Sequence, residues 1–430
     1  MDVLPKLGIP TAKMEWIMKR GMLLLAAVLS AAGSVPLNAR AEAMYRVTVI
    51  GGADSAAYDV NNLGQVVGYM AAGDNYHAFL YDGAGVTDLG TLGNGGSYAA
   101  RLNESGTVVG TSYADDRGYA FVYAAGVMTA LPMGAGSSAN AINNAGVIVG
   151  TMSATDSTGD YQPHAYTYAG GLVTDLGTLP GAYGTYGNAI NGAGEVAGTL
   201  EVGGPPNRPT NPFFYSDGAL QDTGNFGGIF SSAWAMNDHG DVVGSAGVPN
   251  IDGNLYPFHA FLYDAGGLHD LGAMAAGGNS SAYGINELGQ IVGYTDTDAG
   301  PKTYLYSDGN MVLLDSLIDP ASGWTITNAN AINDFQQIAG RACKGDICYA
   351  VRLDLASAVP EPGQATMLAA GMLSVLGLGM RRRIRSPKVR RPRQAASSAW
   401  HRFAIRHSSV ALRRIASILH LEQPNIKTRT

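Results

Sequence analysis

The sequence predicts an all-β fold built from seven copies of one four-stranded repeat. First, the pattern A-x-x-ψ-N-x-x-G-x-ψ-ψ-G, where ψ is apolar, recurs with its asparagines 40–49 residues apart. Second, the 430 residues include 59 glycines and only 14% charged residues, as expected for short strands joined by glycine turns. Third, the repeats carry β-branched pairs such as Val66-Val67, which favour strands. The anchoring asparagines are Asn61, Asn103, Asn143, Asn191, Asn237, Asn286 and Asn333.

The first two predicted strands of each repeat flank the turn N-x-x-G. The asparagine side chain can cap this turn, and the glycine supplies a positive φ. Six repeats have that glycine, whereas Gln336 replaces it in the seventh. A second glycine follows each asparagine by seven positions, from Gly68 to Gly340. An alanine or glycine four positions before each asparagine predicts close packing where neighbouring repeats meet.

The third and fourth predicted strands have their own signatures. The third resembles H-A-F-L-Y, as in His77–Tyr81, and the fourth resembles G-x-x-x-D-L-G-T-L, as in Val86–Leu92. Seven repeats of about four strands match a seven-bladed β-propeller, in which four-stranded blades surround a channel. Tyr45–Gly51 supplies a matching strand ahead of the first repeat, and Leu355 ends the last one. The competing architecture is an open β-solenoid, whose coils are usually shorter than these repeats.

These segments resemble the HAF-repeat extracellular proteins of bacteria. The resemblance covers about residues 45–355 and rests on several segments that recur in fixed order. It implies export and a propeller-like fold for residues 44–356. It implies no catalytic activity.

Residues 1–43 are predicted to be a signal peptide with an upstream leader. Lys19 and Arg20 precede an apolar run from Met22 to Ala32, and small residues with A-x-A cleavage options follow. We therefore expect an N-terminal signal helix. The alternative is a short membrane anchor, but the run is about half as long as the roughly 20 residues that a span needs.

Residues 357–383 resemble the PEP-CTERM sorting signals of Gram-negative, biofilm-forming bacteria. The motif comprises Val359, Pro360, Glu361 and Pro362, then an apolar stretch at 365–380, then Arg381, Arg382 and Arg383. The resemblance implies a transmembrane helix that holds the protein transiently in the inner membrane, with the arginines cytoplasmic. An exosortase-type sorting enzyme would then release it to the cell surface or the exterior. The alternative is an ordinary anchor.

Charge is distributed unevenly along the chain. Residues 44–360 hold 8 Lys+Arg and 29 Asp+Glu, a net charge of −21, so we expect no nucleic-acid partner for the repeats. Residues 384–430 form a basic extension, predicted to be disordered, which follows the arginine cluster where such sorting signals normally end. This extension is either a nucleic-acid or anionic-lipid patch or a stretch without a role.

No motif for catalysis, a metal or a cofactor is recognisable. Cys343 and Cys348 are the chain's two cysteines, and in an exported protein they predict a hairpin disulfide. His77, His164 and His259 occupy the same slot of three repeats, which favours a structural role over metal binding. We therefore predict a binding or structural module of the cell surface or matrix, with exopolysaccharide or another surface protein as partner. The alternative is a propeller hydrolase or lyase acting on polysaccharide.

Three consecutive repeats carry longer loops, which predict a ligand-binding surface. From the anchoring asparagine to the final tyrosine position of H-A-F-L-Y there are 20 residues in repeats one, two, six and seven, but 25, 24 and 26 in repeats three, four and five. Equivalent loops emerge on one face of a propeller, and prolines at 163, 212 and 257 are expected to stiffen them. The candidate ligand-binding residues are Tyr161, Arg208, Asn211, Asn250, Asp252 and Tyr256.

Overall fold

The computed structural model describes residues 45–155, 159, 161–203, 208–249 and 256–356. All of them belong to one compact unit, Met1–Ala358. A second unit, Val359–Thr430, lies outside the described residues, as do the predicted signal peptide, the sorting tail and the basic extension. Within the ranges that are described, no helix is long and apolar enough to cross a membrane.

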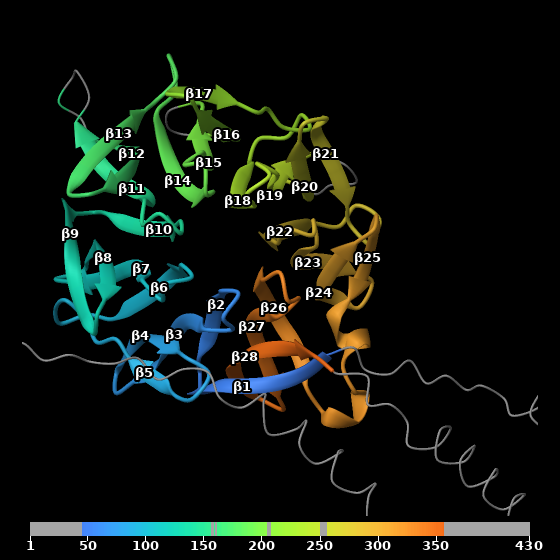
Figure 1. Cartoon of the computed structure of the whole chain (residues 1–430). Coiled ribbons are helices and arrows are strands. Elements are labelled where there is room, and N and C mark those ends of the chain that lie inside the picture. Colours follow the sequence, from blue (N-terminus) through green and yellow to red (C-terminus); the bar gives the residue numbers. More distant parts are fainter. Residues whose placement is uncertain (1–44, 156–158, 160, 204–207, 250–255, 357–430) are drawn as a thin grey trace, which may run out of the picture. The chain divides into compact units, whose positions relative to one another are not determined.

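Seven four-stranded antiparallel sheets surround a central opening (Figure 1). The predicted seven-bladed propeller is therefore confirmed, and the open solenoid is wrong. Apart from strands, the described ranges contain two short 3-10 helices, η1 (Leu314–Leu317) and η2 (Pro320–Ser322). Blades 1 to 6 are β2–β5, β6–β9, β10–β13, β14–β17, β18–β21 and β22–β25, and blade 7 combines β26–β28 with β1.

Each blade runs outwards from an inner strand to an outer strand. The inner strands are β2 (Ala56–Val60), β6 (Ser97–Leu102), β10 (Ser138–Ile142), β14 (Gly184–Ile190), β18 (Ser232–Met236), β22 (Ser280–Ile285) and β26 (Thr325–Ile332). The second strands are β3 (Val66–Ala72), β7 (Val108–Ala114), β11 (Ile148–Thr155), β15 (Val196–Glu201), β19 (Val242–Gly247), β23 (Ile291–Thr297) and β27 (Ile338–Lys344). The third strands are β4 (Asn75–Tyr81), β8 (Arg117–Ala124), β12 (Tyr161–Ala169), β16 (Thr210–Ser216), β20 (Phe258–Asp264), β24 (Gly300–Ser307) and β28 (Ile347–Leu355). The outer strands are β5 (Val86–Asp88), β9 (Val127–Ala135), β13 (Leu172–Gly177), β17 (Ala219–Asp222), β21 (Gly267–Gly272), β25 (Asn310–Leu313) and β1 (Tyr45–Ala53).

Blade 7 closes the ring by joining the two ends of the repeat region. Strand β1 pairs with β28 in antiparallel register, with Tyr45 opposite Leu355 and Val49 opposite Val351. The predicted role of Tyr45–Gly51 as an additional outer strand is thus confirmed, and the strand continues to Ala53. Pairing the first strand with the last repeat covers the edge of β28 and joins the two ends of the repeat region by backbone hydrogen bonds.

The core lies between neighbouring blades. The aromatic position of H-A-F-L-Y is fully buried in every blade, and in six of the seven blades it belongs to a cluster shared with the preceding sheet. Burying one such side chain stabilises the fold by about 1.5–3 kcal/mol. The residues at this position are Phe79, Phe121, Tyr166, Phe213, Phe261, Tyr304 and Val351.

The recurring glycine seven positions after each asparagine is explained by close approach of the first two strands. A Cβ at Gly110 would overlap the carbonyl oxygen of Tyr98 on the inner strand and the ring of Phe121. The equivalent Gly68 would clash with the carbonyl oxygen of Ala56. The small residues four positions before the asparagines are buried as well, such as Ala57 and Ala99. The predicted close packing is therefore confirmed.

Because strands alternate in direction, the ring has two different faces. The face that carries the N-x-x-G turns, between inner and second strands, is called the turn face. The opposite face carries the loops between second and third strands and the connections between blades, and is called the loop face.

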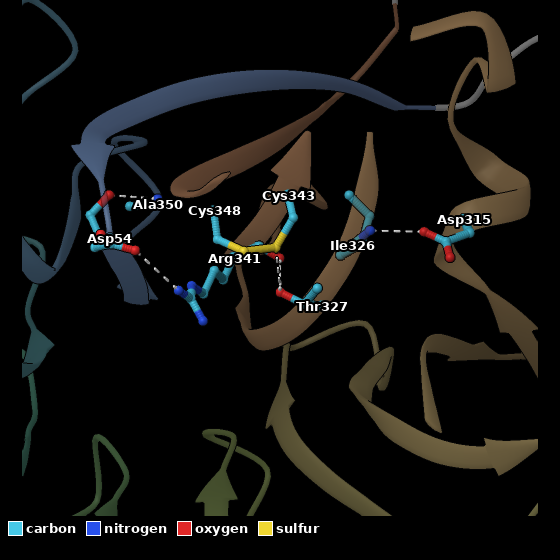
Figure 2. The surroundings of a disulfide bond; sticks show 9 residues. Asp54, Asp315, Ile326, Thr327, Arg341, Cys343, Cys348 and Ala350 are labelled. Carbon is cyan, nitrogen blue, oxygen red and sulfur yellow. Dashed lines mark hydrogen bonds and ion pairs between the residues drawn. A yellow bond between two sulfur atoms is a disulfide. The ribbon is translucent and has the colours of Figure 1, made fainter. Parts of the chain in front are cut away.

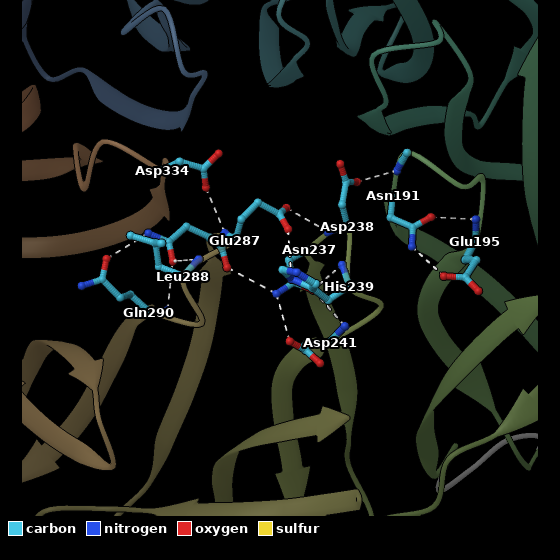
Figure 3. Close-up of polar contacts among 12 residues, drawn as sticks. Asn191, Glu195, Asn237, Asp238, His239, Asp241, Glu287, Leu288, Gln290 and Asp334 are labelled. Atoms are coloured by element: carbon cyan, nitrogen blue, oxygen red, sulfur yellow. Dashed lines mark hydrogen bonds and ion pairs between the residues drawn. The ribbon is translucent and has the colours of Figure 1, made fainter. Parts of the chain in front are cut away.

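On the turn face, the anchoring asparagines join each blade to the next (Figure 3). Asn237 Oδ1 accepts hydrogen bonds from the backbone N–H groups of His239 and Asp241, at 3.1 and 2.9 Å, which is the predicted cap of its own turn. Its Nδ2 donates to the carbonyl oxygen of Asn286 on the next blade, at 3.3 Å. Six of the seven asparagines make this inter-blade bond, including Asn333 to Asn61 across the closure.

A second set of bonds runs one residue further along each turn. The N–H of Asp238 donates to Glu287 Oε1, and the N–H of Glu287 donates to Asp334 Oδ1, both at 2.9 Å (Figure 3). Gly192 has no side chain to accept from blade 3, but its own N–H donates to Asp238 Oδ1 of blade 5, at 2.6 Å. In the first set, Asn191 O accepts from Asn143 of blade 3, whereas Asn191 Nδ2 donates to Glu195 of its own turn. Blade 4 thus lacks one link of each set, the first-set link to blade 5 and the second-set link from blade 3.

Candidate functional site

The inner strands enclose a central channel with two adjoining cavities. The cavity nearer the turn face has a volume of about 160 Å³ and is lined by residues of all seven inner strands, among them Leu102, Ile142 and Met236. The cavity nearer the loop face has a volume of about 200 Å³ and is lined by Tyr58, Ala100, Arg101, Trp234, Tyr283 and Asn330. The two cavities share Arg101 and Trp234, so they adjoin each other.

The side chains of the loop-side cavity come from bulges in the inner strands. In β2, β6 and β18 the pairing register shifts at the residue three positions before the asparagine, where Tyr58, Ala100 and Trp234 lie. A bulge leaves that residue unpaired and re-aims its side chain. In blades 3, 4 and 7 the same position is an asparagine that donates to a neighbouring blade, as Asn330 does to Ala57 O at 2.7 Å.

An acidic and a basic side chain line the cavities. Arg101 lines both of them, and Asp59 lines the cavity nearer the turn face. Asp59 Oδ2 accepts a hydrogen bond from the N–H of Leu102, at 3.0 Å. Burial raises the pKa of Asp59 above its ordinary value, and the positive charge of Arg101 and backbone N–H groups only partly oppose this effect. Arg101 Nη1 donates to the carbonyl oxygens of Tyr58 and Ala100, at 3.3 and 3.1 Å.

Five tyrosines continue the aromatic lining from the channel to the loop face across blades 1 and 2. We call this group the tyrosine stripe; it consists of Tyr58, Tyr69, Tyr76, Tyr98 and Tyr113. Neighbouring rings lie 5.1–6.3 Å apart, mostly edge to face, as aromatic pairs prefer. Tyr76 and Tyr113 are 39% and 40% exposed, while the other three are half-buried. Tyr58 belongs to both the stripe and the loop-side cavity.

The described ends of the long loops of repeats three, four and five lie on the loop face, where the second strand of each blade ends and the third begins. Tyr161 and Tyr256 are 75% and 54% exposed. Tyr256 packs edge to face on Phe230, at 5.3 Å between ring centres. Thr210 N donates to the carbonyl oxygen of Ile229, so the connection at 229–230 bridges the loops of blades 4 and 5.

Two other residues of the predicted loop surface are engaged within the protein. Arg208 Nε lies 3.3 Å from Oε1 of the buried Glu201, and its guanidinium lies over the ring of Tyr183. Asn211 donates to Asp222 Oδ2 at 2.8 Å and accepts from Asn225 Nδ2 at 2.6 Å. The last two predicted residues, Asn250 and Asp252, lie outside the described residues.

Two of the three loop prolines are placed differently from the expectation. Pro163 and Pro212 lie within β12 and β16 rather than before these strands, because antiparallel pairing extends into the longer loops. Pro163 is opposite Ser153, and Pro212 is opposite Thr199. Pro257 directly precedes β20, as predicted.

Each recurring histidine pairs with an aspartate of the outer strand in its own blade. The Nδ1 atoms of His77, His164 and His259 lie 2.9 Å from carboxylate oxygens of Asp88, Asp175 and Asp270. Asn211 makes the equivalent contact to Asp222 in blade 4. A structural role in fastening the outer strand explains why the histidine slot recurs. Within the described ranges, no group of three or more His, Cys, Asp or Glu side chains is arranged to hold a metal.

The cysteines form the predicted disulfide at the hairpin of β27 and β28 (Figure 2). Cys343 and Cys348 are directly opposite one another, with Cα atoms 3.9 Å apart. Arg341 Nη2 of the same hairpin lies 3.9 Å from Asp54 Oδ1, at the end of β1 (Figure 2). The bridge therefore lies in the blade that closes the ring.

Comparison with known proteins finds similarity of fold and no named family. No family model matches the chain, and no curated protein matches it either. Among solved structures, the chain is similar to the β-propeller domain of the trilobed protease from Pyrococcus furiosus, with 11% identity, a TM-score of 0.44 and coverage of 60% of this chain and 81% of that one. It is also similar to the Pyrococcus horikoshii acylaminoacyl peptidase, with 13% identity, a TM-score of 0.45 and coverage of 67% and 50%. Virginiamycin B lyase from Staphylococcus aureus shares 12% identity, with a TM-score of 0.40 and coverage of 73% and 100%.

Proposed function

We propose that this chain is an exported surface or matrix protein whose seven-bladed ring binds a neutral, β-linked exopolysaccharide along the tyrosine stripe. The observation that carries the proposal is the continuity of aromatic side chains from the channel to the loop face. Sugar rings present C–H groups on their flat faces, and these pack favourably on the electron-rich faces of aromatic rings. Exposed tyrosines add hydroxyls that exchange hydrogen bonds with sugar hydroxyls.

The terminal segments support the cellular context of this proposal. The signal peptide at 1–43 delivers the chain across the inner membrane, and the sorting tail at 357–383 holds it there until an exosortase-type enzyme releases it. The resemblance of the repeats to HAF-repeat proteins agrees with this route. The net charge of −21 on residues 44–360 keeps the ring away from nucleic acid and anionic membrane surfaces.

Binding without turnover is the form of the proposal that the channel favours. Glycoside hydrolases generally use two carboxyl groups on opposite sides of the scissile bond. Of the described residues, Asp59 is the one carboxylate that lines the channel cavities. A hydrolase would release new reducing ends from the bound polysaccharide, and we expect none.

The proposal is tested by gel retardation of the purified full-length protein in hydroxyethyl cellulose, a soluble β-linked glucan. We expect the double variant Tyr76→Ala, Tyr113→Ala to bind about five- to 150-fold more weakly, since each aromatic contact contributes about 0.5–1.5 kcal/mol. Both side chains are exposed, so the fold should persist.

Tyr161→Ala is the matched control, because it removes an even more exposed tyrosine from blade 3. Retardation lost in this variant and kept in the double variant would move the site to the long loops. Retardation unchanged in both variants would overturn polysaccharide binding by either surface.

A further inference from the structure

The loop-side cavity combines aromatic walls with one cationic group. Tyr58, Trp234 and Tyr283 enter it from blades 1, 5 and 6, and Arg101 and Asn330 supply polar atoms. Its volume of about 200 Å³ suits a single sugar ring and is smaller than the roughly 300–1,000 Å³ of pockets for drug-sized ligands. Trp234 is 38% exposed although it belongs to an inner strand, so a large aromatic face is available to a ligand.

Arg101 has hydrogen-bonding capacity that its protein contacts leave unused. A guanidinium carries five N–H groups in a planar fork. The contacts of Arg101 are made by Nη1, with the carbonyl oxygens of Tyr58 and Ala100. Within the described ranges, no carboxylate lies within 4.0 Å of it, whereas Arg208 and Arg352 each have an acidic partner at 3.3 and 2.8 Å.

Asp59 does not neutralise this guanidinium by direct contact. Its carboxylate is held by the backbone N–H of Leu102 instead. The field of Arg101 therefore reaches the cavity, where the low dielectric of the channel makes it stronger than that of a solvated arginine. Asn330 adds an amide oxygen as acceptor, since its Nδ2 is used by Ala57 O.

We propose that the loop-side cavity is a subsite for a terminal uronic acid residue, whose ring packs between the aromatic side chains and whose carboxylate pairs with Arg101. A planar carboxylate matches the guanidinium fork in two parallel hydrogen bonds, which a neutral hydroxymethyl group does not reproduce. This inference rests on the proposed function and adds to it the chemical identity of the terminal sugar.

The charge of the whole ring limits the ligand to one carboxylate at the chain end. At a net charge of −21, residues 44–360 repel a polyanion at long range. Physiological salt screens that repulsion beyond about 8 Å. A single carboxylate that reaches Arg101 inside the channel thus gains the local attraction, whereas a polyuronate chain would bring many charges over an acidic surface.

Isothermal titration of the full-length protein with two matched disaccharides tests the proposal. Cellobiouronic acid and cellobiose share both rings, and differ by a carboxylate in place of a hydroxymethyl group on the terminal ring. We expect the acid to bind at least about tenfold more tightly, the change that one charge-assisted hydrogen bond produces. Arg101→Gln should bring the ratio of the two affinities close to one.

A variant in the adjoining cavity changes the charge near Arg101 with opposite sign. Asp59→Asn keeps an oxygen acceptor for Leu102 N and removes a negative charge, so it should strengthen binding of the acid several-fold relative to cellobiose. Equal affinity of the wild-type protein for the two disaccharides, or a ratio unaffected by Arg101→Gln, overturns the uronate subsite. If retardation by hydroxyethyl cellulose still depends on Tyr76 and Tyr113 in that case, the proposed function stands and the subsite alone is rejected.

Discussion

The two faces of the ring use the repeated sequence in opposite ways. On the turn face, the same asparagine performs the same task in nearly every blade, and the links it makes run around the ring. On the loop face, the blades differ from one another in loop length and in their aromatic side chains. The positions that repeat therefore specify the architecture, whereas the positions that depart from the repeat form the surface available for binding.

The largest effect should come from breaking the turn face where the ring closes. Asn333→Ala removes the bond from Nδ2 to Asn61 O at 2.8 Å and leaves the N–H of Gln337 without its side-chain acceptor. Because these groups are buried or partly buried, we expect a loss of about 3 kcal/mol in the free energy of unfolding, measured with urea.

Asn191→Ala is the internal control for that loss. Its Nδ2 donates to Glu195 within its own turn, not to the next blade. We expect this variant to lose about 1 kcal/mol less than Asn333→Ala. Equal losses would show that the inter-blade bond of Asn333 does not contribute measurably to the free energy of unfolding.

The channel should contribute a pH dependence of stability through Asp59. Because burial raises the pKa of Asp59, the folded state holds its proton more strongly than the unfolded state. The stabilisation is full below the unfolded value of about 3.8 and is lost as pH rises through the higher folded pKa. The unfolding free energy of the wild-type protein minus that of Asp59→Asn should therefore fall as the pH is raised above about 3.8. A difference that is flat or rises over this range contradicts the shift.

A smaller gain is expected from restoring the repeat at its one irregular turn. Gln336 adopts a φ of 61°, in the region that the equivalent glycines occupy at 71–87°. Gln336→Gly should stabilise the ring by up to about 1 kcal/mol, because a side chain is disfavoured there. The reverse change in the neighbouring turn, Gly289→Gln, should destabilise by a similar amount, and the same sign for both changes would refute this account.

The smallest effect is expected on the loop face. Tyr161 is 75% exposed, so Tyr161→Ala should change the free energy of unfolding by no more than about 0.5 kcal/mol. A thermal or urea unfolding curve compared with that of Asn333→Ala gives the contrast between the two faces directly. A loss approaching that of Asn333→Ala would mean that the long loops, too, contribute to holding the ring.

Much of the fold could be predicted because its causes recur in each repeat. Three features recur at fixed spacing because each has a cause within its own blade. They are the seven anchoring asparagines, the turn glycine, and the glycine that lies against the inner strand. The histidine–aspartate pairs were also visible in principle, since His77 and Asp88 are 11 residues apart, as are His164 and Asp175. That spacing indicates the pairs only when the histidine strand and the outer strand of each repeat are compared together.

The channel and the tyrosine stripe could not be found in this way. Tyr58, Tyr69 and Tyr76 occupy different positions of one repeat and meet only because strands β2, β3 and β4 fold into one blade. Arg101 and Trp234 are separated by most of three repeats and meet across the axis. Such contacts follow from ring closure. The described ends of the long loops lie on one face, as predicted. Asn211 contacts Asp222 at the same 11-residue spacing as the histidine–aspartate pairs, whereas the contacts of Arg208 with Glu201 and Tyr183 follow from no repeated spacing.

The closure of blade 7 constrains how a ring of this kind can gain or lose repeats. Its outer strand comes from one end of the repeat region and its other three strands come from the opposite end. A copy added beyond Leu355 would follow a sheet that is already complete. It could not pair with β28, because β1 and β27 cover both edges of that strand. Duplication or deletion of a whole repeat inside the region, between β2 and β25, leaves the pairing of β1 with β28 intact. The number of blades can therefore change in this architecture only by gain or loss of repeats between β1 and β28, with both of these strands retained.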